Sequence, residues 1–324
     1  MNPFKNARII SDNYDGRLYC SQPINENGKR IGRGDPNYVM NRSALMDFSE
    51  CPSRWIRSRA GDDSTKSTDW GSLVDCLLFE PCKLTERFSL QPRDYPTEKG
   101  DTKPWSNNAN FCKAWNAAEE KAGRIIIKEA DLLEAELAIK RIVECDVVTP
   151  VLQESRSQVY ATAEYHDRTG LVIPFKTLMD LVPNDGDAIW DLKTSKSANP
   201  STWARAVHQF GYHAQAAIEL DIYNAATKQK RERFFHLVQE NFQPYEVCVM
   251  ELDPSFISLG RTIYKQALEE YAYALSTGHY RDFAQLQPSS RCVGGIPIVS
   301  PESWMIEKTS TVDPDWMSDE KQTN

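Results

Sequence analysis

The chain has 324 residues, of which 40% are hydrophobic and 26% charged, a composition typical of a soluble globular protein with one large domain or two small ones. It contains no run of about 18 apolar residues and no apolar leader at its N-terminus, so we expect no membrane span, no signal peptide and a cytoplasmic location. The net charge of −8 argues against a surface that is basic throughout but allows one basic groove.

The N-terminal part is expected to be irregular at first and helical afterwards. Residues 1–40 are rich in Asn, Gly, Asp and Pro and predict an irregular arm. A helix should begin at Asn41 or Ser43, with inward side chains at Leu45, Phe48 and Trp55. Asp69 is expected to cap a second helix, which Pro81 ends.

Two further helices are expected over about 107–122 and 128–146. The second carries an apolar stripe at nearly helical spacing, formed by Leu132, Leu133, Leu137, Ile139, Ile142 and Val143. Beyond residue 150 short β-branched and aromatic segments predict strands at about 158–166, 171–183, 187–194, 233–239 and 244–252.

Two more helices complete the pattern, one over about 200–227 between the third and fourth strands and one over about 254–277 after the last. This order predicts an α/β fold with a central mixed sheet flanked by helices and preceded by a helical region. We therefore expect an arm over 1–40, a folded domain over 41–280 (helical part 41–150, core 151–280) and a loosely ordered tail over 281–324.

The segment LMDLVPNDGDAIWDLKT contains the residues that predict chemistry. Asp180 lies on a strand before an Asn-Asp-Gly turn, and Asp191 and Lys193 share one face of the next strand. Two adjacent carboxylates repel each other unless a cation lies between them, and oxygen ligands suit Mg²⁺ or Mn²⁺. The carbonyl of Leu192 is a plausible further ligand, and Lys193 can orient an attacking water or neutralise charge on a phosphate.

The alternative is an exposed hairpin with a surface Asp–Lys pair, because the triplet Asp-x-Lys is common by chance. The following helix adds a polar stripe of His208, Tyr212, Gln215 and Glu219 beside an apolar stripe of Val207, Phe210, Ala214, Ile218 and Ile222. Residues 193–233 hold seven basic and three acidic side chains, which suits contacts to phosphates. A helix that merely exposes one polar face is the other interpretation, and His208 alone is more simply structural.

These residues carry a family resemblance. The segment from Met179 to Tyr223 resembles the RecE-type (exonuclease VIII-like) branch of the RecB-like PD-(D/E)XK nucleases, with matches at Asp180, Asp191, Lys193, Thr194, Ser195, Tyr212, Gln215 and Tyr223. WGSLVDCLLFEP resembles the family's first motif, with Asp75 where the family has a histidine, and SALMDFSECPSRW resembles its N-terminal helix. Met179 also replaces a proline that precedes the first aspartate in the family.

The resemblance implies a restriction-endonuclease-like core and a Mg²⁺-dependent exonuclease, with Mn²⁺ as a substitute, that degrades one strand of linear double-stranded DNA. It also implies 5′-to-3′ polarity, a role in phage recombination, a ring-shaped homo-oligomer and a single-strand-annealing recombinase as partner. The implied metal ligands are Asp75, Asp180, Asp191 and the Leu192 carbonyl, and the implied DNA contacts are Ser195, Lys196, Tyr212 and Gln215. Asp75 could instead be a solvated helix position.

Other residues leave alternatives open. Glu164, on the strand before the hairpin, could serve a second metal or hold a metal-binding side chain in place, and a surface glutamate is equally consistent. The eight cysteines are scattered without a Cys-x-x-Cys pair, so we expect neither a zinc ribbon nor an iron–sulfur cluster, and Cys51 should be a core residue.

Two other functions remain compatible with the sequence. One is a different RecB-like nuclease, of the CRISPR-associated kind for example, with another polarity or endonuclease activity. The other is a DNA-binding module whose catalytic site has decayed, and Asp75 in place of the family's histidine would be the first sign of that decay. The joint presence of Asp180, Asp191 and Lys193 argues against decay.

Overall fold

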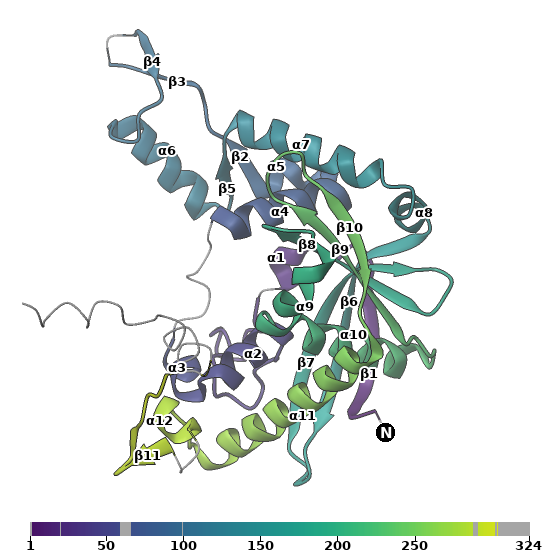
Figure 1. Ribbon diagram of the computed structural model, residues 1–324. Coiled ribbons are helices and arrows are strands. Elements are labelled where there is room, and N and C mark those ends of the chain that lie inside the picture. Colours follow the sequence, from purple (N-terminus) through teal and green to yellow (C-terminus); the bar gives the residue numbers. More distant parts are fainter. Residues whose placement is uncertain are drawn as a thin grey trace, which may run out of the picture.

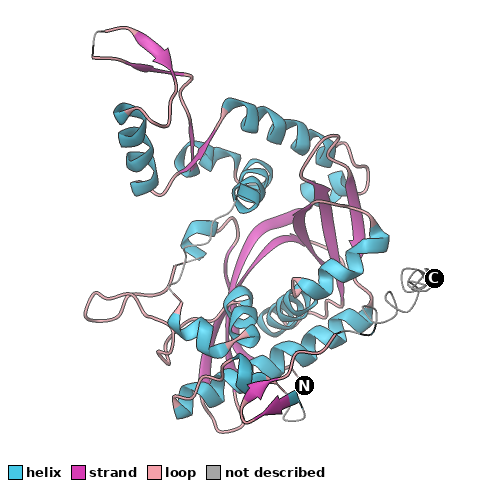
Figure 2. Ribbon diagram, turned by 60° about the vertical axis from the view of Figure 1, so that its left-hand side comes forward, coloured by secondary structure: helices cyan, strands magenta, loops and turns pink. Residues whose placement is uncertain are grey.

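A computed structural model of the chain describes residues 2–19, 21–58, 66–98, 100–287, 291–301 and 303. Its centre is a six-stranded sheet, which Figures 1 and 2 show between layers of helices. The strands lie in the order β1 (Phe4–Ser11), β6 (Ser155–His166), β7 (Val172–Pro183), β8 (Ala188–Ser195), β9 (Arg233–Glu240) and β10 (Val247–Glu251). Neighbouring strands are antiparallel except β8 and β9, which are parallel.

Helices bury both faces of the sheet. One face packs on α2 (Arg42–Glu50), α3 (Pro52–Arg57), α10 (Tyr212–Thr227) and α11 (Pro254–Thr277). Over β8, β9 and β10 the other face packs on α4 (Lys66–Phe79), α7 (Glu129–Val143) and α8 (Val148–Gln153). The parallel β8–β9 pair needs a crossover connection, which α9 (Pro200–Gln209) and α10 supply.

Smaller elements surround this core. They are α1 (Gly16–Tyr19), η1 (Pro81–Lys83), α5 (Leu84–Arg87), β2 (Phe88–Leu90), β3 (Asp94–Pro96), β4 (Thr102–Pro104), α6 (Asn110–Lys121), β5 (Ile125–Ile127), α12 (Phe283–Leu286), β11 (Cys292–Val293) and β12 (Ile296–Pro297). Figure 1 shows α6 and the β3–β4 hairpin projecting from the molecule on the side of α4 and α7.

The mixed sheet flanked by helices confirms the expected fold class, and each of the five expected strands is present. The side chain of Asn41 caps α2 by accepting a hydrogen bond from the Ala44 amide, and Leu45, Phe48 and Trp55 are buried as predicted. The single helix expected there is two, because α2 ends before Cys51 and Trp55 lies on α3. Cys51 is buried, and the cysteines of the described residues are free thiols. None of the described helices is long and apolar enough to cross a membrane.

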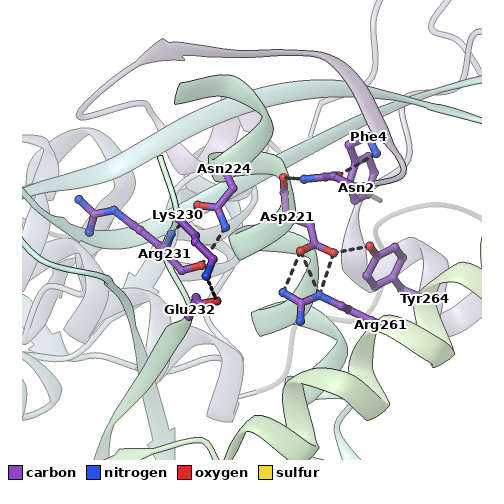
Figure 3. A network of polar contacts seen from close by, with 9 residues as sticks. All are labelled: Asn2, Phe4, Asp221, Asn224, Lys230, Arg231, Glu232, Arg261 and Tyr264. Atoms are coloured by element: carbon purple, nitrogen blue, oxygen red, sulfur yellow. Dashed lines mark hydrogen bonds and ion pairs between the residues drawn. The ribbon is translucent and has the colours of Figure 1, made fainter. Parts of the chain in front are cut away.

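The N-terminal arm was the main error of the fold prediction. Residues 4–11 form β1, an edge strand paired antiparallel with β6. Figure 3 shows a polar network beside this strand, in which the Asp221 carboxylate accepts hydrogen bonds from Arg261 and from the Tyr264 hydroxyl. The Asn2 amide donates to the Asp221 carbonyl, so Asn2 is tied to α10, and the Asp221 side chain in turn binds α11.

Three helix predictions also need correction. Helix α4 begins at Lys66, so Asp69 lies inside its first turn and does not cap it. In α7 the predicted stripe is only partly inward, because Leu133, Leu137 and Val143 are exposed while the small residues Ala135 and Ala138 are buried. The single helix expected over 200–227 is two helices, α9 and α10. Most of the expected tail lies outside the described residues.

Candidate active site

Strands β7 and β8 bring the two predicted aspartates together. The strands pair at Leu181 and Trp190, which places Asp180 opposite Asp191. Just beyond this pair, the Leu192 amide donates to the Asp180 carboxylate at 2.8 Å instead of to a backbone carbonyl. Because the N–H and C=O of a strand residue point to the same side, the Leu192 carbonyl is also directed toward Asp180.

Lys193 lies beside Asp191, as the alternation of the strand predicts. Its ammonium forms an ion pair with the Asp191 carboxylate and lies 4.9 Å from the ring centroid of Tyr212. Trp190 and Leu192 point to the opposite face, where they join the apolar clusters beneath α4, α7 and α8. The side chains of Asp191 and Lys193 therefore face α10.

Helix α10 contributes a glutamine that bridges two carboxylates. The Gln215 amide nitrogen donates to Asp191 at 2.6 Å and to Glu219 at 2.9 Å. Its oxygen accepts a hydrogen bond from Arg42 of α2 at 2.9 Å. The arginine thereby fixes which end of the amide faces the carboxylates. Glu219 is only 2% exposed, and its Oε2 atom has no hydrogen-bond partner among the described residues.

Helix α4 brings a third aspartate to the same place. Asp75 accepts a hydrogen bond from Gln158 of β6 at 3.0 Å and lies 3.7 Å from the Arg87 guanidinium. The close approach of α4 to β8 depends on Gly71, because a Cβ atom there would lie 3.1 Å from the Thr194 hydroxyl. A cavity of about 410 Å³ opens at this junction, lined by Thr68, Gly71, Ser72, Asp75, Leu192, Lys193, Thr194 and Tyr212.

The electrostatics of the cluster reflect crowded negative charge. Burial, followed by the neighbouring Asp191 and Asp75, raises the pKa of Asp180 well above its usual value. Burial and Asp191 raise the pKa of Glu219 to about 8, and burial, opposed by Arg87, raises the pKa of Asp75 to about 6. Burial disfavours the charged form of Lys193, but Asp191 and Asp180 outweigh it and raise the lysine pKa.

The hairpin with two aspartates and a lysine, beside a helix with an inward glutamine, lies within the part of the chain that matches a known family. Residues 41–288 match the family described as a PDDEXK-like domain of unknown function, DUF3799. The chain belongs to this PDDEXK-like family.

Solved structures support the fold of this PDDEXK-like protein. The crystal structure of a candidate exonuclease from Eubacterium rectale aligns with a TM-score of 0.52 and 18% identity, covering 85% of this chain and 94% of that one. At this identity the likeness supports the fold alone. An alkaline exonuclease from Laribacter hongkongensis aligns with a TM-score of 0.25 and 14% identity over 53% of this chain and 84% of that one, and we base no inference on it. No curated protein matches the sequence significantly.

The donor set of the PDDEXK-like site fits a hard divalent cation. Asp75, Asp180, Asp191 and the Leu192 carbonyl supply oxygen atoms, and the raised pKa values of Asp75 and Asp180 mark a cluster that lacks positive charge. Among the described residues no group of three acidic, histidine or cysteine side chains is arranged closely enough to hold a metal by itself. Lys193 is the cation that contacts Asp191 in this structure.

The structure does not bring every predicted site residue to this cluster. Glu164 lies six residues along β6 from Gln158, pairs with Lys5 of β1 and contacts Asn6 and His166. At about 3.3 Å per residue this separation is about 20 Å, so Glu164 does not contact the predicted metal ligands. The β6 residue that does contact them is Gln158.

The other predicted contacts divide into an inner and an outer group. Tyr212 lines the cavity and Gln215 contacts Asp191, whereas Ser195 and the exposed Lys196 lie at the end of β8. His208 lies on α9 and stacks on His213, with ring centroids 5.8 Å apart, so the polar stripe is interrupted before Tyr212.

Sequence reasoning did not identify Arg42, Gln158 and His236. His236 of β9 pairs in register with Asp191, is fully buried and accepts a hydrogen bond from the Trp203 indole at 3.1 Å. Burial lowers its pKa to about 3, so the ring is neutral beneath the site. Gln158 and His236 lie in segments without a local motif, and Arg42 only adjoins the segment that resembles the family's N-terminal helix, so tertiary packing alone connects these residues to the hairpin.

Proposed function

We propose that the protein is a Mg²⁺-dependent DNA exonuclease that degrades one strand of linear double-stranded DNA. The observation that carries this proposal is the cluster of Asp75, Asp180 and Asp191 with Lys193 at the edge of an open cavity. Burying several carboxylates with one lysine destabilises the fold unless a further cation binds among them. Such clusters are typical of catalytic sites that use a cation.

In this proposal the carboxylates bind the metal and Lys193 stabilises charge on the phosphate. Asp75, Asp180, Asp191 and the Leu192 carbonyl would hold the ion, which supplies Lewis-acid activation of a phosphate and of water when it is bound. Lys193 would place its positive charge against the phosphate as negative charge develops there. Its position over the Tyr212 ring keeps the ammonium at the cavity and away from bulk water.

Contacts to DNA are proposed for residues at the rim of the cavity. Ser195 and Lys196 follow Lys193 closely in the chain, and Tyr212 lines the cavity wall. Gln215 would act mainly by holding Asp191, since its amide is already bonded to two carboxylates. Degradation in the 5′-to-3′ direction, a ring-shaped oligomer, an annealing recombinase partner and a role in phage recombination rest on the RecE-type resemblance.

The test is digestion of a linear duplex carrying different labels at its 5′ and 3′ ends, with a covalently closed circle as the second substrate. We expect loss of label from one type of end with Mg²⁺ or Mn²⁺, none with chelator, and an intact circle. Lys193→Ala should keep DNA affinity but lower turnover by about 10²- to 10³-fold. Lys140→Ala, which changes an exposed lysine of α7 that does not line the cavity, is the matched control and should digest DNA at the wild-type rate.

Two outcomes would contradict this proposal. Cleavage of the closed circle would make the protein an endonuclease, the other RecB-like interpretation of the sequence. Tight binding of duplex ends without cleavage in either metal would make it a DNA-binding module with an inactive site.

A further inference from the structure

Gln158 has a backbone conformation that its residue type rarely adopts. Its φ is +48°, in the left-handed region, where side chains with a Cβ atom are disfavoured. It lies inside β6, between the register pairs Ser157–Leu181 and Val159–Met179, so it faces Asp180 across the strands. Strained non-glycine residues persist where the surrounding structure holds them in place.

Residues 13 and 14 of the N-terminal segment hold Gln158 in this backbone conformation. The amides of Asn13 and Tyr14 donate to the carbonyls of Ser157 and Gln158 at 2.9 and 3.0 Å. The Ser157 hydroxyl donates to the Asn13 side chain at 2.8 Å, and the Tyr14 ring stacks on Tyr160 with centroids 4.1 Å apart. A segment distant in sequence thus fixes the backbone of β6 at Ser157 and Gln158.

The consequence of the strained conformation is the direction of the glutamine side chain. Gln158 is 2% exposed, and its amide nitrogen donates to Oδ1 of Asp75 at 3.0 Å. Oδ2 of the same carboxylate lies 3.7 Å from Arg87. With one oxygen bonded and the other beside a cation, the carboxylate plane of Asp75 is fixed from two sides, while each oxygen keeps a lone pair for another partner.

We propose that Gln158 is a positioning residue, held in a left-handed conformation by residues 13 and 14, that orients Asp75 as a metal ligand of the site. This inference rests on the proposed function, since it concerns how one of the proposed ligands is held. Removing a group that orients a metal ligand typically weakens metal affinity by about 10- to 100-fold.

The test compares variants that suit the strained backbone but lose the contact. Gln158→Gly accepts positive φ freely, and Gln158→Asn tolerates it with an amide one methylene too short to reach Asp75. Calorimetric titration with Mn²⁺ should give a dissociation constant raised by about 10-fold or more in both. Their melting temperatures in chelator should stay close to that of the wild type. Lys228→Gly, which changes another positive-φ residue, at the end of α10, should bind Mn²⁺ like the wild type.

A double-variant cycle shows whether the effect passes through Asp75. In an Asp75→Asn background, Gln158→Gly should cause no further loss of Mn²⁺ affinity, because the carboxylate it orients is already absent. A full additional loss, or unchanged affinity in Gln158→Gly and Gln158→Asn, would overturn the inference while leaving the proposed function intact. Wild-type protein that fails to bind Mn²⁺ would overturn both.

Discussion

Glu219 and Asp75 add negative charge to a site that already holds Asp180 and Asp191. Arg42 bonds to the Gln215 amide and to none of the carboxylates among the described contacts, and Arg87 is shared between Asp75 and the buried Glu80. One lysine therefore faces several carboxylates, and burial makes each ionised carboxylate costly. The raised pKa values of Asp75, Asp180 and Glu219 mean that these carboxyl groups keep their protons to higher pH than usual, so we expect the stability of the metal-free protein to depend on pH.

Glu219→Gln should flatten the dependence of stability on pH in the metal-free protein. The pKa of Glu219 is raised to about 8 in the folded state, whereas the unfolded chain releases that proton near pH 4.5. The folded state therefore binds the extra proton between these values, and the free energy of unfolding falls as pH rises from about 5 to 8. An amide cannot ionise, so the slope should decrease by up to about 1.4 kcal/mol per pH unit.

Urea unfolding in chelator at pH 5, 6.5 and 8 measures this slope. The exposed Glu232→Gln variant, whose side chain is 64% accessible, is the matched control and should keep the wild-type slope. Equal slopes for the wild type and Glu219→Gln would show that Glu219 is ionised throughout the range.

The sequence predicted Asp180, Asp191 and Lys193 because local rules determine their placement. Alternation along a strand fixes which side chains share a face, and a short turn fixes which strands are neighbours. Gln158 and Glu164 are both polar residues of β6, and the sequence singled out only Glu164, with a surface position as an equally consistent alternative. Only the left-handed backbone of Gln158, imposed by a segment about 145 residues earlier in the chain, decides between them.

At the scale of the helices, the break between α9 and α10 determines which residues face the site. Gly211 has a φ of +66° and ends α9, so α10 starts at Tyr212 in a new direction. Phe210, expected in the apolar stripe, is 53% exposed for this reason. The periodicity continues across the break with little interruption, and the sequence therefore predicted one helix.

Gly211→Ala should destabilise the fold. An alanine at this position would have to adopt the left-handed backbone conformation, which is strained for residues with a Cβ atom. Its Cβ would also lie 3.3 Å from Cγ and Sδ of Met46 on α2. The strain alone costs about 1–2 kcal/mol, and the contact with Met46 adds to it. Gly278→Ala is the matched control, because Gly278 has a φ of +69° and a Cβ atom added there would meet no other atom within 4 Å. Chemical unfolding should show a larger loss for Gly211→Ala, and equal losses would mean that the contact with α2 is unimportant.

At the scale of the whole molecule, the folded unit extends beyond the part that the family match covers. The match begins at residue 41, yet β1 forms the edge of the central sheet and residues 13 and 14 bond to β6 beside the site. The composition of residues 1–40, rich in Asn, Gly, Asp and Pro, suggested an irregular arm, and the eight residues of β1 show little alternation of apolar and polar side chains. Pairing with β6, a tertiary interaction, makes this segment a strand.

Phe4→Ala should therefore destabilise the whole domain, although Phe4 is only the fourth residue. Its ring is 4% exposed and packs against Tyr165, Phe175 and Tyr264, with centroids 6.4, 5.4 and 5.6 Å away. Truncating a buried phenylalanine costs about 3–5 kcal/mol, which lowers the melting temperature of a protein of this size by at least about 5 °C. Lys5→Ala, on the exposed side of the same strand, should melt within about 1 °C of the wild type. If the melting temperature of Phe4→Ala were also within about 1 °C of the wild type, β1 would not contribute to the stability of the core.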